Sequence, residues 1–309
     1  MIEYNNSNIL KLAAIDIGSN AVRLLITNVI PTRDHTYYQK VSIIRLPIRL
    51  GADSFPAGKI SKKNGKRLIK GIRSYKLLME VHGVEDYRAC ATSALREAKN
   101  GRELTKKVFS KTGINIEIIG GKEEAKLIFA AKLFDKIHPE ENSFLYVDVG
   151  GGSTELTLFH RGSLVNSQSF LIGTVRLLNN MVKAERWKEM RDWIETNTKG
   201  IDNIAMIGSG GNINRTFKMS GKKLGEPLDF DYIVGFLDEL KGYSKQELIT
   251  IKGLNLDRAD VIFPALQIYL FATEKAGAKK MYVPKIGVSD GIIRDLYHRK
   301  YREEFESNM

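Results

Sequence analysis

The feature that most constrains the fold is a short pattern that occurs twice in the chain. In residues 12–26 an apolar run at 12–17 contains Asp16, two residues before a Gly-Ser-Asn turn, and a second apolar run follows the turn. In residues 144–160 an apolar run at 144–149 contains Asp148, two residues before a Gly-rich turn, and an alternating segment follows the turn. Each copy predicts a β-hairpin with an acid near the end of its first strand. We interpret the repetition as one α/β unit duplicated, with the two hairpins facing each other across a cleft.

Strands and helices alternate through the rest of the chain. Apolar residues at 68, 72, 75 and 79 have the period of a helix, which we expect over 61–81, after an extended segment at 41–46 and before a strand at 87–91. Further helices are expected at 94–110, 122–134, 176–199, 213–219, 233–240, 258–276 and from 291, with strands at 114–119, 204–207 and 280–284. This alternation predicts the α/β class.

The length of the chain suggests two domains. Its 309 residues exceed the usual ~150 residues of one domain about twofold. Gly120-Gly121 punctuates the sequence, so we expect an N-terminal α/β domain over 1–121 and a C-terminal α/β domain over 122–309. We expect that the last helix of the second domain, about 291–309, can pack back on the N-terminal domain.

The amino-acid composition restricts the kinds of partner that the chain is expected to bind. The chain has 48 Lys and Arg against 36 Asp and Glu, a formal charge of +12, which favours an anionic partner. No nucleic-acid motif accompanies this charge, and no apolar stretch is long enough to cross a membrane. The N-terminus has no signal peptide and Cys90 is the single cysteine, so we expect a cytoplasmic protein in a reducing compartment. A homodimer is a possible assembly.

Gly-rich turns suit phosphate because residues without Cβ let backbone N–H groups converge on an anion. The common nucleotide loops are missing, so any single turn could be merely structural, but two matching turns and a third cluster favour phosphate binding. Hydroxyls at a strand end followed by Arg on a helix also suit a phosphoryl group, with an ordinary helix N-cap as the alternative. The expected phosphate-binding residues are Gly18, Ser19, Asn20, Thr92, Ser93, Arg96, Gly150, Gly151, Gly152, Ser153, Gly210 and Gly211.

Acids at the strand ends are candidates for Mg²⁺ ligands. That ion usually binds one or two carboxylates together with substrate phosphates. Asp16 and Asp148 occupy such positions, and each could instead cap its own turn. Asp148 is the stronger candidate because Glu155 supplies a second acid on the facing strand.

A pair of acids, Glu123 and Glu124, opens the helix that follows Gly120-Gly121. An acid at a helix start usually compensates the helix dipole. A helix at the junction of two phosphate-binding halves would, however, point an acid into the cleft. There it could act as a general base that activates water for attack on a phosphoanhydride.

Seven collinear motifs resemble the exopolyphosphatase / guanosine pentaphosphate phosphohydrolase (Ppx/GppA) family. They are AAIDIGSNAVR from Ala13, ATSALREAKN from Ala91, IGGKEEA from Ile119, VDVGGGSTEL from Val147, LIGTVRL from Leu171, IGSGGN from Ile207 and VSDGIIR from Val288. The resemblance implies duplicated ribonuclease H-like domains of the actin, Hsp70, acetate kinase and sugar kinase superfamily. It also implies Mg²⁺-dependent removal of the terminal phosphate of polyphosphate, or of the 5′ γ-phosphate of guanosine pentaphosphate (pppGpp).

Residue by residue, the resemblance implies that Glu124 is the catalytic base and Glu123 a weaker candidate. It implies a metal-linked role for Asp148, with Glu155 as the acid on the facing strand, and it assigns the cluster at 208–211 to the superfamily's adenosine-side loop. Two other functions remain open: an alarmone- or nucleotide-binding sensor with vestigial hydrolysis, and a phosphotransferase from polyphosphate to ADP.

The sequence departs from the family pattern in two places. Longer members continue into a helical C-terminal region, whereas this chain ends at Met309, so the resemblance implies the short two-domain form without long-chain specialisation. Arg294 is followed by Asp295 where the family usually has Gly, and we expect this change to alter only a helix near the surface.

Overall fold

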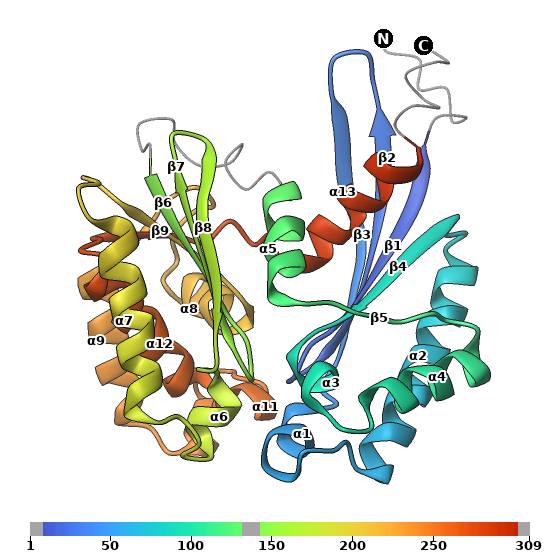
Figure 1. Cartoon of the computed structure of the whole chain (residues 1–309), viewed down its shortest axis with the longest axis horizontal. Coiled ribbons are helices and arrows are strands. Elements are labelled where there is room, and N and C mark those ends of the chain that lie inside the picture. Colours follow the sequence, from blue (N-terminus) through green and yellow to red (C-terminus); the bar gives the residue numbers. More distant parts are fainter. Residues whose placement is uncertain (1–8, 132–142, 302–309) are drawn as a thin grey trace. The chain divides into compact units, whose positions relative to one another are not determined.

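The computed structural model describes residues 9–131 and 143–301, and the chain divides into two compact units (Figure 1). Unit 1 comprises the described residues up to Ala131 and again from Val288, and unit 2 comprises those between them. The division therefore falls ten residues later than the expected 121/122. The reason is that helix α5 (Gly121–Ala130) packs against the final helix α13 (Val288–Lys300), which in turn packs on the sheet of unit 1.

The sheet of unit 1 is mixed. Its strands lie in the order β3-β2-β1-β4-β5, with β1, β2 and β3 antiparallel and β4 and β5 parallel to β1. The strands are β1 (Leu10–Ile17), β2 (Val22–Pro31), β3 (Thr36–Leu46), β4 (Asp86–Ala91) and β5 (Glu117–Ile118). The helices are α1 (Gly51–Ala57), α2 (Lys62–Val81), α3 (Ser93–Glu97), α4 (Gly101–Thr112), α5 and α13. Within this unit, α2 and α4 cover one face of the sheet and α5 and α13 lie on the other (Figure 1).

Periodicity explains why these elements form. Strand β1 is apolar on both sides and almost entirely buried, as expected for a strand covered on both faces. Helix α2 buries the predicted stripe of Leu68, Ile72, Tyr75 and Met79, and it begins at Ser61, whose side chain accepts a hydrogen bond from the backbone N–H of Asn64. The expected helix and hairpin are therefore confirmed.

Unit 2 has a second mixed sheet, in the order β10-β11-β9-β6-β7-β8. The strands are β6 (Ser143–Val149), β7 (Thr154–His160), β8 (Ser163–Phe170), β9 (Ala205–Ser209), β10 (Leu228–Asp229) and β11 (Lys280–Tyr282). The helices are α6 (Thr174–Leu178), α7 (Ala184–Thr198), α8 (Gly211–Met219), α9 (Phe230–Lys241), α10 (Lys245–Thr250), α11 (Leu256–Ala259) and α12 (Ile262–Lys275). Apolar side chains of β6, β7, β9, α7, α9 and α12 form its core.

The two units repeat one topology, which confirms the predicted duplication. Strands β1, β2 and β3 correspond to β6, β7 and β8, which are likewise antiparallel, and β4 and β9 lie parallel to the first strand of each set. Each hairpin is closed in the same way. The N–H of Gly18 donates to the carbonyl of Ala21 at 3.1 Å, and that of Gly150 donates to the carbonyl of Ser153 at 2.9 Å.

Several predicted helices are shorter or divided. The expected helix 94–110 is α3 followed by α4, because Asn100 leaves the helix and exchanges hydrogen bonds with both backbone groups of Ile60. The expected helix 176–199 is α6 followed by α7, with Asn180 at a φ of +54° between them. The expected strand 114–119 pairs only at Glu117–Ile118. The end of the expected helix 122–134 lies outside the described residues.

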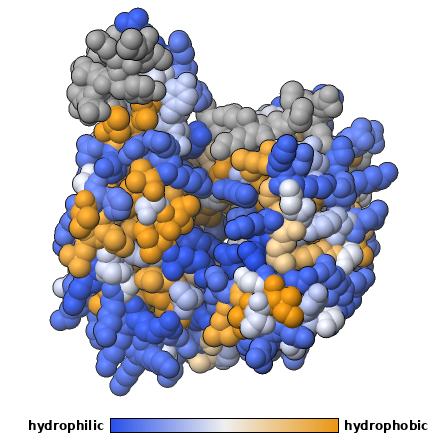
Figure 2. Space-filling view, turned by 180° about the vertical axis from the view of Figure 1, so that it is seen from behind, coloured by the Kyte–Doolittle hydropathy of each residue, from blue (hydrophilic) through white to orange (hydrophobic). Residues whose placement is uncertain are grey.

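The described part of the chain has no helix that is both long enough and apolar enough to cross a membrane. The face shown in Figure 2 carries hydrophobic groups interspersed among hydrophilic ones. Exposed apolar groups are normal on globular proteins, because apolar atoms contribute much of any folded protein's surface.

Candidate active site

The Gly150–Ser153 turn of unit 2 is built to present backbone N–H groups. Its carbonyls are engaged from behind by helix α6. The N–H of Thr174 donates to the carbonyl of Gly150 at 3.0 Å, the N–H of Val175 donates to that of Gly151 at 2.8 Å, and the Arg176 Nε donates to that of Gly152 at 2.7 Å. Within the described part of the chain, the N–H groups of Gly151 and Gly152 donate no hydrogen bond. The loop can therefore offer them to an anion.

Gly173 holds this turn in place. A Cβ at Gly173 would lie 2.5 Å from the carbonyl oxygen of Gly151, so only glycine lets α6 approach the turn this closely. The segment around Leu171 is recognisable in the sequence only as a family motif. The roles of Gly173 and Arg176 have no local sequence signal, because they depend on packing between α6 and the turn.

Two predicted metal ligands meet on unit 2. Asp148 and Glu155 are direct partners in the β6–β7 ladder, and such partners project from the same face of a sheet. Glu155 is 3% exposed, and its Oε1 accepts hydrogen bonds from the hydroxyls of Ser153 at 2.7 Å and Ser169 at 2.9 Å. Within residues 9–131 and 143–301, no three or more acidic, His or Cys side chains cluster so that they could hold a metal by themselves. A pair of acids beside a phosphate loop fits Mg²⁺, which takes the rest of its ligands from phosphate and water.

The third Gly cluster closes the same region of unit 2. Gly210 has a φ of +117°, and its missing Cβ would lie 3.5 Å from the Asp148 Oδ1. Helix α8 begins directly after it at Gly211, so the positive end of that helix lies beside the Asp148 carboxylate. Tyr269 donates a hydrogen bond to the carbonyl of Ser209, and burial, followed by the charge of Asp148, raises the pKa of the Tyr269 hydroxyl well above its usual value.

The predicted phosphate residues of unit 1 also come together. Ser19, in the first hairpin, and Ser93, at the start of α3, share a buried hydrogen bond of 2.9 Å between their hydroxyls. Strand β4 ends beside β1, because the N–H of Thr92 donates to the carbonyl of Ile17 at 3.2 Å. The carbonyl of Asn20 accepts from the N–H of Arg49 at 3.0 Å, which ties the turn to the segment before α1.

Asp16 has a different environment from its counterpart Asp148. Its direct partner in the β1–β2 ladder is Arg23, and the Arg23 Nη1 lies 2.7 Å from the Asp16 Oδ2. In this hairpin the facing residue is thus a cation, where the second hairpin has Glu155. The ion pair makes Asp16 the weakest of the three proposed metal ligands.

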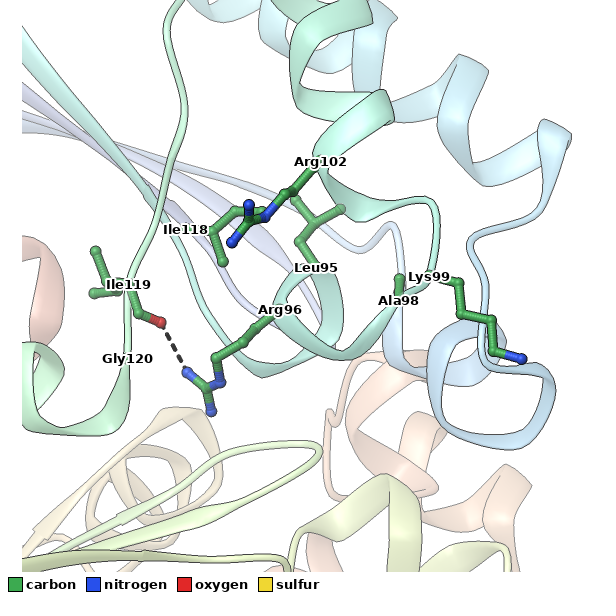
Figure 3. A pocket seen from close by; sticks show the side chains of 8 residues that line it. All are labelled: Leu95, Arg96, Ala98, Lys99, Arg102, Ile118, Ile119 and Gly120. Atoms are coloured by element: carbon green, nitrogen blue, oxygen red, sulfur yellow. Dashed lines mark hydrogen bonds between the residues drawn. The ribbon is translucent and has the colours of Figure 1, made fainter.

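Arg96 borders a pocket of about 400 Å³ within unit 1 (Figure 3). Its Nη1 donates to the carbonyl of Ile119 at 2.9 Å, which ties the guanidinium to the segment leading into α5. Arg96 and Arg102 extend toward the same side of the pocket, whereas Lys99 extends away from them (Figure 3). The described residues that line the pocket include these cations and no acid, so the pocket is suited to an anion.

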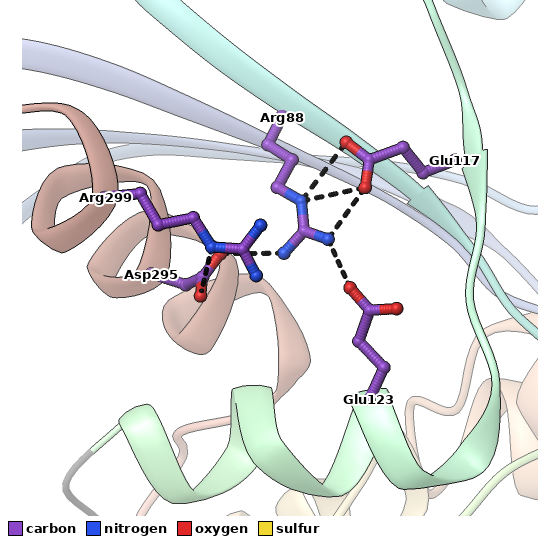
Figure 4. A network of polar contacts seen from close by, with 5 residues as sticks. All are labelled: Arg88, Glu117, Glu123, Asp295 and Arg299. Carbon is purple, nitrogen blue, oxygen red and sulfur yellow. Dashed lines mark hydrogen bonds and ion pairs between the residues drawn. The ribbon is translucent and has the colours of Figure 1, made fainter.

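The two acids of α5 differ in their surroundings. Glu124 is 7% exposed. Glu123 is more accessible, and its Oε1 lies 2.5 Å from the Arg88 Nη2 (Figure 4). Glu123 thus forms an ion pair with Arg88, and Glu124 is the more buried of the two acids.

The contacts of Asp295 show that the expectation for this position was wrong. We expected the change at this position to affect only a helix near the surface. Instead the Asp295 Oδ2 lies 2.8 Å from the Nη1 of the buried Arg88, and its Oδ1 lies 2.9 Å from the Arg299 Nε. The sequence alone did not predict the role of Arg88 or its contact with Asp295, because the two residues are 207 positions apart.

The topology of the two sheets and the comparisons with known proteins indicate the same fold. Two mixed sheets with the same topology, each flanked by helices, define the actin-like ATPase fold. The chain belongs to the Ppx/GppA phosphatase family, whose model matches residues 29–300. The crystal structure of the Aquifex aeolicus member of that family superposes with a TM-score of 0.74 and 25% identity, covering 95% of this chain and 99% of that one. The structure of an exopolyphosphatase from Cytophaga hutchinsonii has a TM-score of 0.80 at 20% identity, covers 94% of this chain and 98% of that one, and supports the fold.

Curated relatives are longer than this chain. A bifunctional 3-dehydroquinate synthase/phosphatase of Fusobacterium nucleatum is 30% identical over 289 residues, which cover 85% of this chain and 43% of that protein. Exopolyphosphatase 1 of Mycobacterium tuberculosis is 27% identical over 191 residues, which cover 60% of this chain and 54% of that protein. The chain thus spans about half the length of these relatives.

Proposed function

We propose that this chain is a Mg²⁺-dependent phosphohydrolase that removes the terminal phosphate of inorganic polyphosphate, the 5′ γ-phosphate of pppGpp, or both. The observation that carries the proposal is the pair of acids Asp148 and Glu155, which face each other beside the Gly150–Ser153 turn. Family membership and the name of one relative, exopolyphosphatase 1 of Mycobacterium tuberculosis, support the choice of substrate class.

The phosphate groups would be held by the described donors of each unit. The N–H groups of Gly151 and Gly152 in unit 2 would bind phosphate oxygens, as would the hydroxyls of Ser19 and Ser93 and the guanidinium of Arg96 in unit 1. Such donors stabilise a transition state because they are already in place when negative charge develops. The neighbouring cations of the Arg96 pocket would attract the remaining phosphates of the chain.

Glu124 would act as the general base. It would accept a proton from water as the water oxygen forms a bond to the terminal phosphorus. The bond from that phosphorus to the bridging oxygen breaks, and the shortened phosphate chain leaves with the bond's electron pair. Asp148 and Glu155 would hold Mg²⁺, which, when bound, neutralises charge on the phosphate oxygens.

The proposal is tested by phosphate release measured side by side on tripolyphosphate, long-chain polyphosphate and pppGpp, with Mg²⁺ and with a chelator. We expect many turnovers on at least one substrate and loss of activity with the chelator. Tight binding of pppGpp in a calorimeter with no turnover would contradict the proposal and favour a sensor. Formation of ATP from polyphosphate and ADP in place of free phosphate would favour a phosphotransferase.

A further inference from the structure

Arg88 joins four elements of unit 1 through a single buried guanidinium. The side chain comes from β4 and is 6% exposed. Its nitrogens lie 2.7 Å from Glu117 of β5, 2.5 Å from Glu123 of α5 and 2.8 Å from Asp295 of α13 (Figure 4). Burial lowers the pKa of Arg88, but the hydrogen bonds to Glu117 and Glu123 more than offset this, so the pKa is raised and the cation is permanent. A planar fork of N–H donors can hold all of these acids in one fixed geometry.

The same face of α5 makes a second contact with α13. Glu123 and Leu127 are one turn apart on α5, and Gly291 and Asp295 are one turn apart on α13. A Cβ at Gly291 would lie 1.8 Å from the carbonyl oxygen of Leu127, so the two helix backbones touch there. One turn away, the Glu123–Arg88–Asp295 contact joins the helices again. These two contacts on one face fix the distance between α5 and α13. They also fix the rotation of α5 about its own axis.

That rotation decides where Glu124 points. Consecutive residues of an α-helix are about 100° apart around the axis. Because Glu123 is held at Arg88, Glu124 is aimed away from that contact by this angle. A rotation of α5 about its axis would move the Glu124 carboxylate sideways.

We propose that Arg88 is a positioning residue that holds Glu123 and Asp295 and so fixes the direction of Glu124. This inference rests on the proposed function, since it takes Glu124 to be the base. A buried ion pair contributes little to stability compared with an apolar replacement, so a role in stability alone explains the arrangement poorly. A role in position explains why one cation contacts both helices. Misplacing a catalytic group by 1 Å costs about 100-fold in rate, so positional control has large consequences.

The test compares variants of two acids bound to the same guanidinium. Glu123→Ala removes the acid on α5, and the matched control Glu117→Ala removes the one on β5, so each loses one negative charge beside Arg88. Steady-state kinetics on tripolyphosphate and thermal unfolding are measured for both. We expect Glu123→Ala to lower kcat about 10- to 100-fold with KM unchanged within about twofold. We expect Glu117→Ala to change kcat less than about threefold, because it leaves α5 held.

A double-mutant cycle with Arg88→Met separates positioning from general destabilisation. If both groups act through one contact, Glu123→Ala will add little to the kcat loss already caused by Arg88→Met. Arg88→Lys keeps the positive charge, so it should retain part of the activity that Arg88→Met loses. If Arg88→Met does not fold, the test rests on Arg88→Lys and Glu123→Ala. In Glu123→Ala, Arg88 still has its ion pairs with Glu117 and Asp295.

Three outcomes would overturn the inference. The first is an equal kcat loss in Glu117→Ala and Glu123→Ala. The second is a change in KM and melting temperature with no separate effect on kcat. The third is a loss in Glu123→Ala as deep as that in Glu124→Gln, which would make Glu123 itself a catalytic residue. If instead Glu124→Gln keeps full activity, the proposed base is wrong, and the failure lies with the proposed function.

Discussion

Asp148 stands directly opposite Glu155 in its hairpin, whereas its counterpart Asp16 stands opposite Arg23 and forms an ion pair with it at 2.7 Å. One duplicated hairpin thus carries two acids next to its turn, and the other carries an acid and a cation there. A cation beside a carboxylate opposes the binding of a second cation there. The Asp148–Glu155 pair of unit 2 is therefore the better candidate for the proposed metal site.

We predict that Asp148→Asn and Glu155→Gln will each raise the Mg²⁺ concentration needed for half-maximal phosphate release at least about tenfold, as loss of one charged ligand interaction implies. Asp16→Asn should change that concentration by less than about twofold, although it removes the ion pair with Arg23. A Mg²⁺ titration at saturating tripolyphosphate measures all three variants. An equal shift in Asp16→Asn would refute the difference between the units.

The Arg96 pocket predicts an electrostatic contribution to substrate binding. Arg102→Gln should raise KM for tripolyphosphate about two- to tenfold at low salt, because an exposed charge near a polyanion contributes modestly. The effect should fade as ionic strength increases. Arg73→Gln on α2 is the control, since Arg73 is an exposed cation outside the pocket. The same increase in both variants would mean that only the overall charge matters.

Close packing at Gly173 predicts a sharp steric effect. Gly173→Ala places a Cβ 2.5 Å from the carbonyl oxygen of Gly151, so the Gly150–Ser153 turn must shift. We expect a loss of about 1–3 kcal/mol in the free energy of unfolding, as for overpacking in general, together with a loss of kcat/KM. Urea unfolding and kinetics measure these two effects. Gly235→Ala in α9 is the control, because a Cβ there meets nothing within 4 Å, and a loss as large in that variant would rule out the steric explanation.

The sequence predicted those parts of the site that are encoded locally. The hairpins with Asp16 and Asp148 follow from apolar runs on either side of a Gly-rich turn, and Glu155 as the facing partner of Asp148 follows from the second hairpin. Contacts between distant segments were not predictable in this way. Arg88 gave no local signal, because its role depends on α13 returning to unit 1 after the whole of unit 2. The break in the expected helix 94–110 also has a distant cause, the Ile60 backbone that holds Asn100.

Burial of Cys90 predicts a dependence of stability on alkaline pH. Burial raises the pKa of this thiol from 9.0 to about 12. Above pH 9.0 the unfolded chain loses the proton while the folded chain keeps it, so the free energy of unfolding falls as pH rises towards 12. We expect the share from Cys90 to be about 1 kcal/mol by pH 10. Urea unfolding at pH 7 and 10 should show a smaller fall in Cys90→Ala than in the unchanged chain, and equal falls would contradict this assignment.

Glu124 is the residue on which the proposed mechanism depends most. It is buried at the start of α5, beside an acid that Arg88 already holds. The direct test is phosphate release from tripolyphosphate by the unchanged chain and by Glu124→Gln, with substrate binding measured in parallel by calorimetry. We predict that Glu124→Gln will lower kcat about 10²- to 10⁴-fold, the contribution of a general base, while binding changes less than about threefold. Full activity in Glu124→Gln would contradict the mechanism.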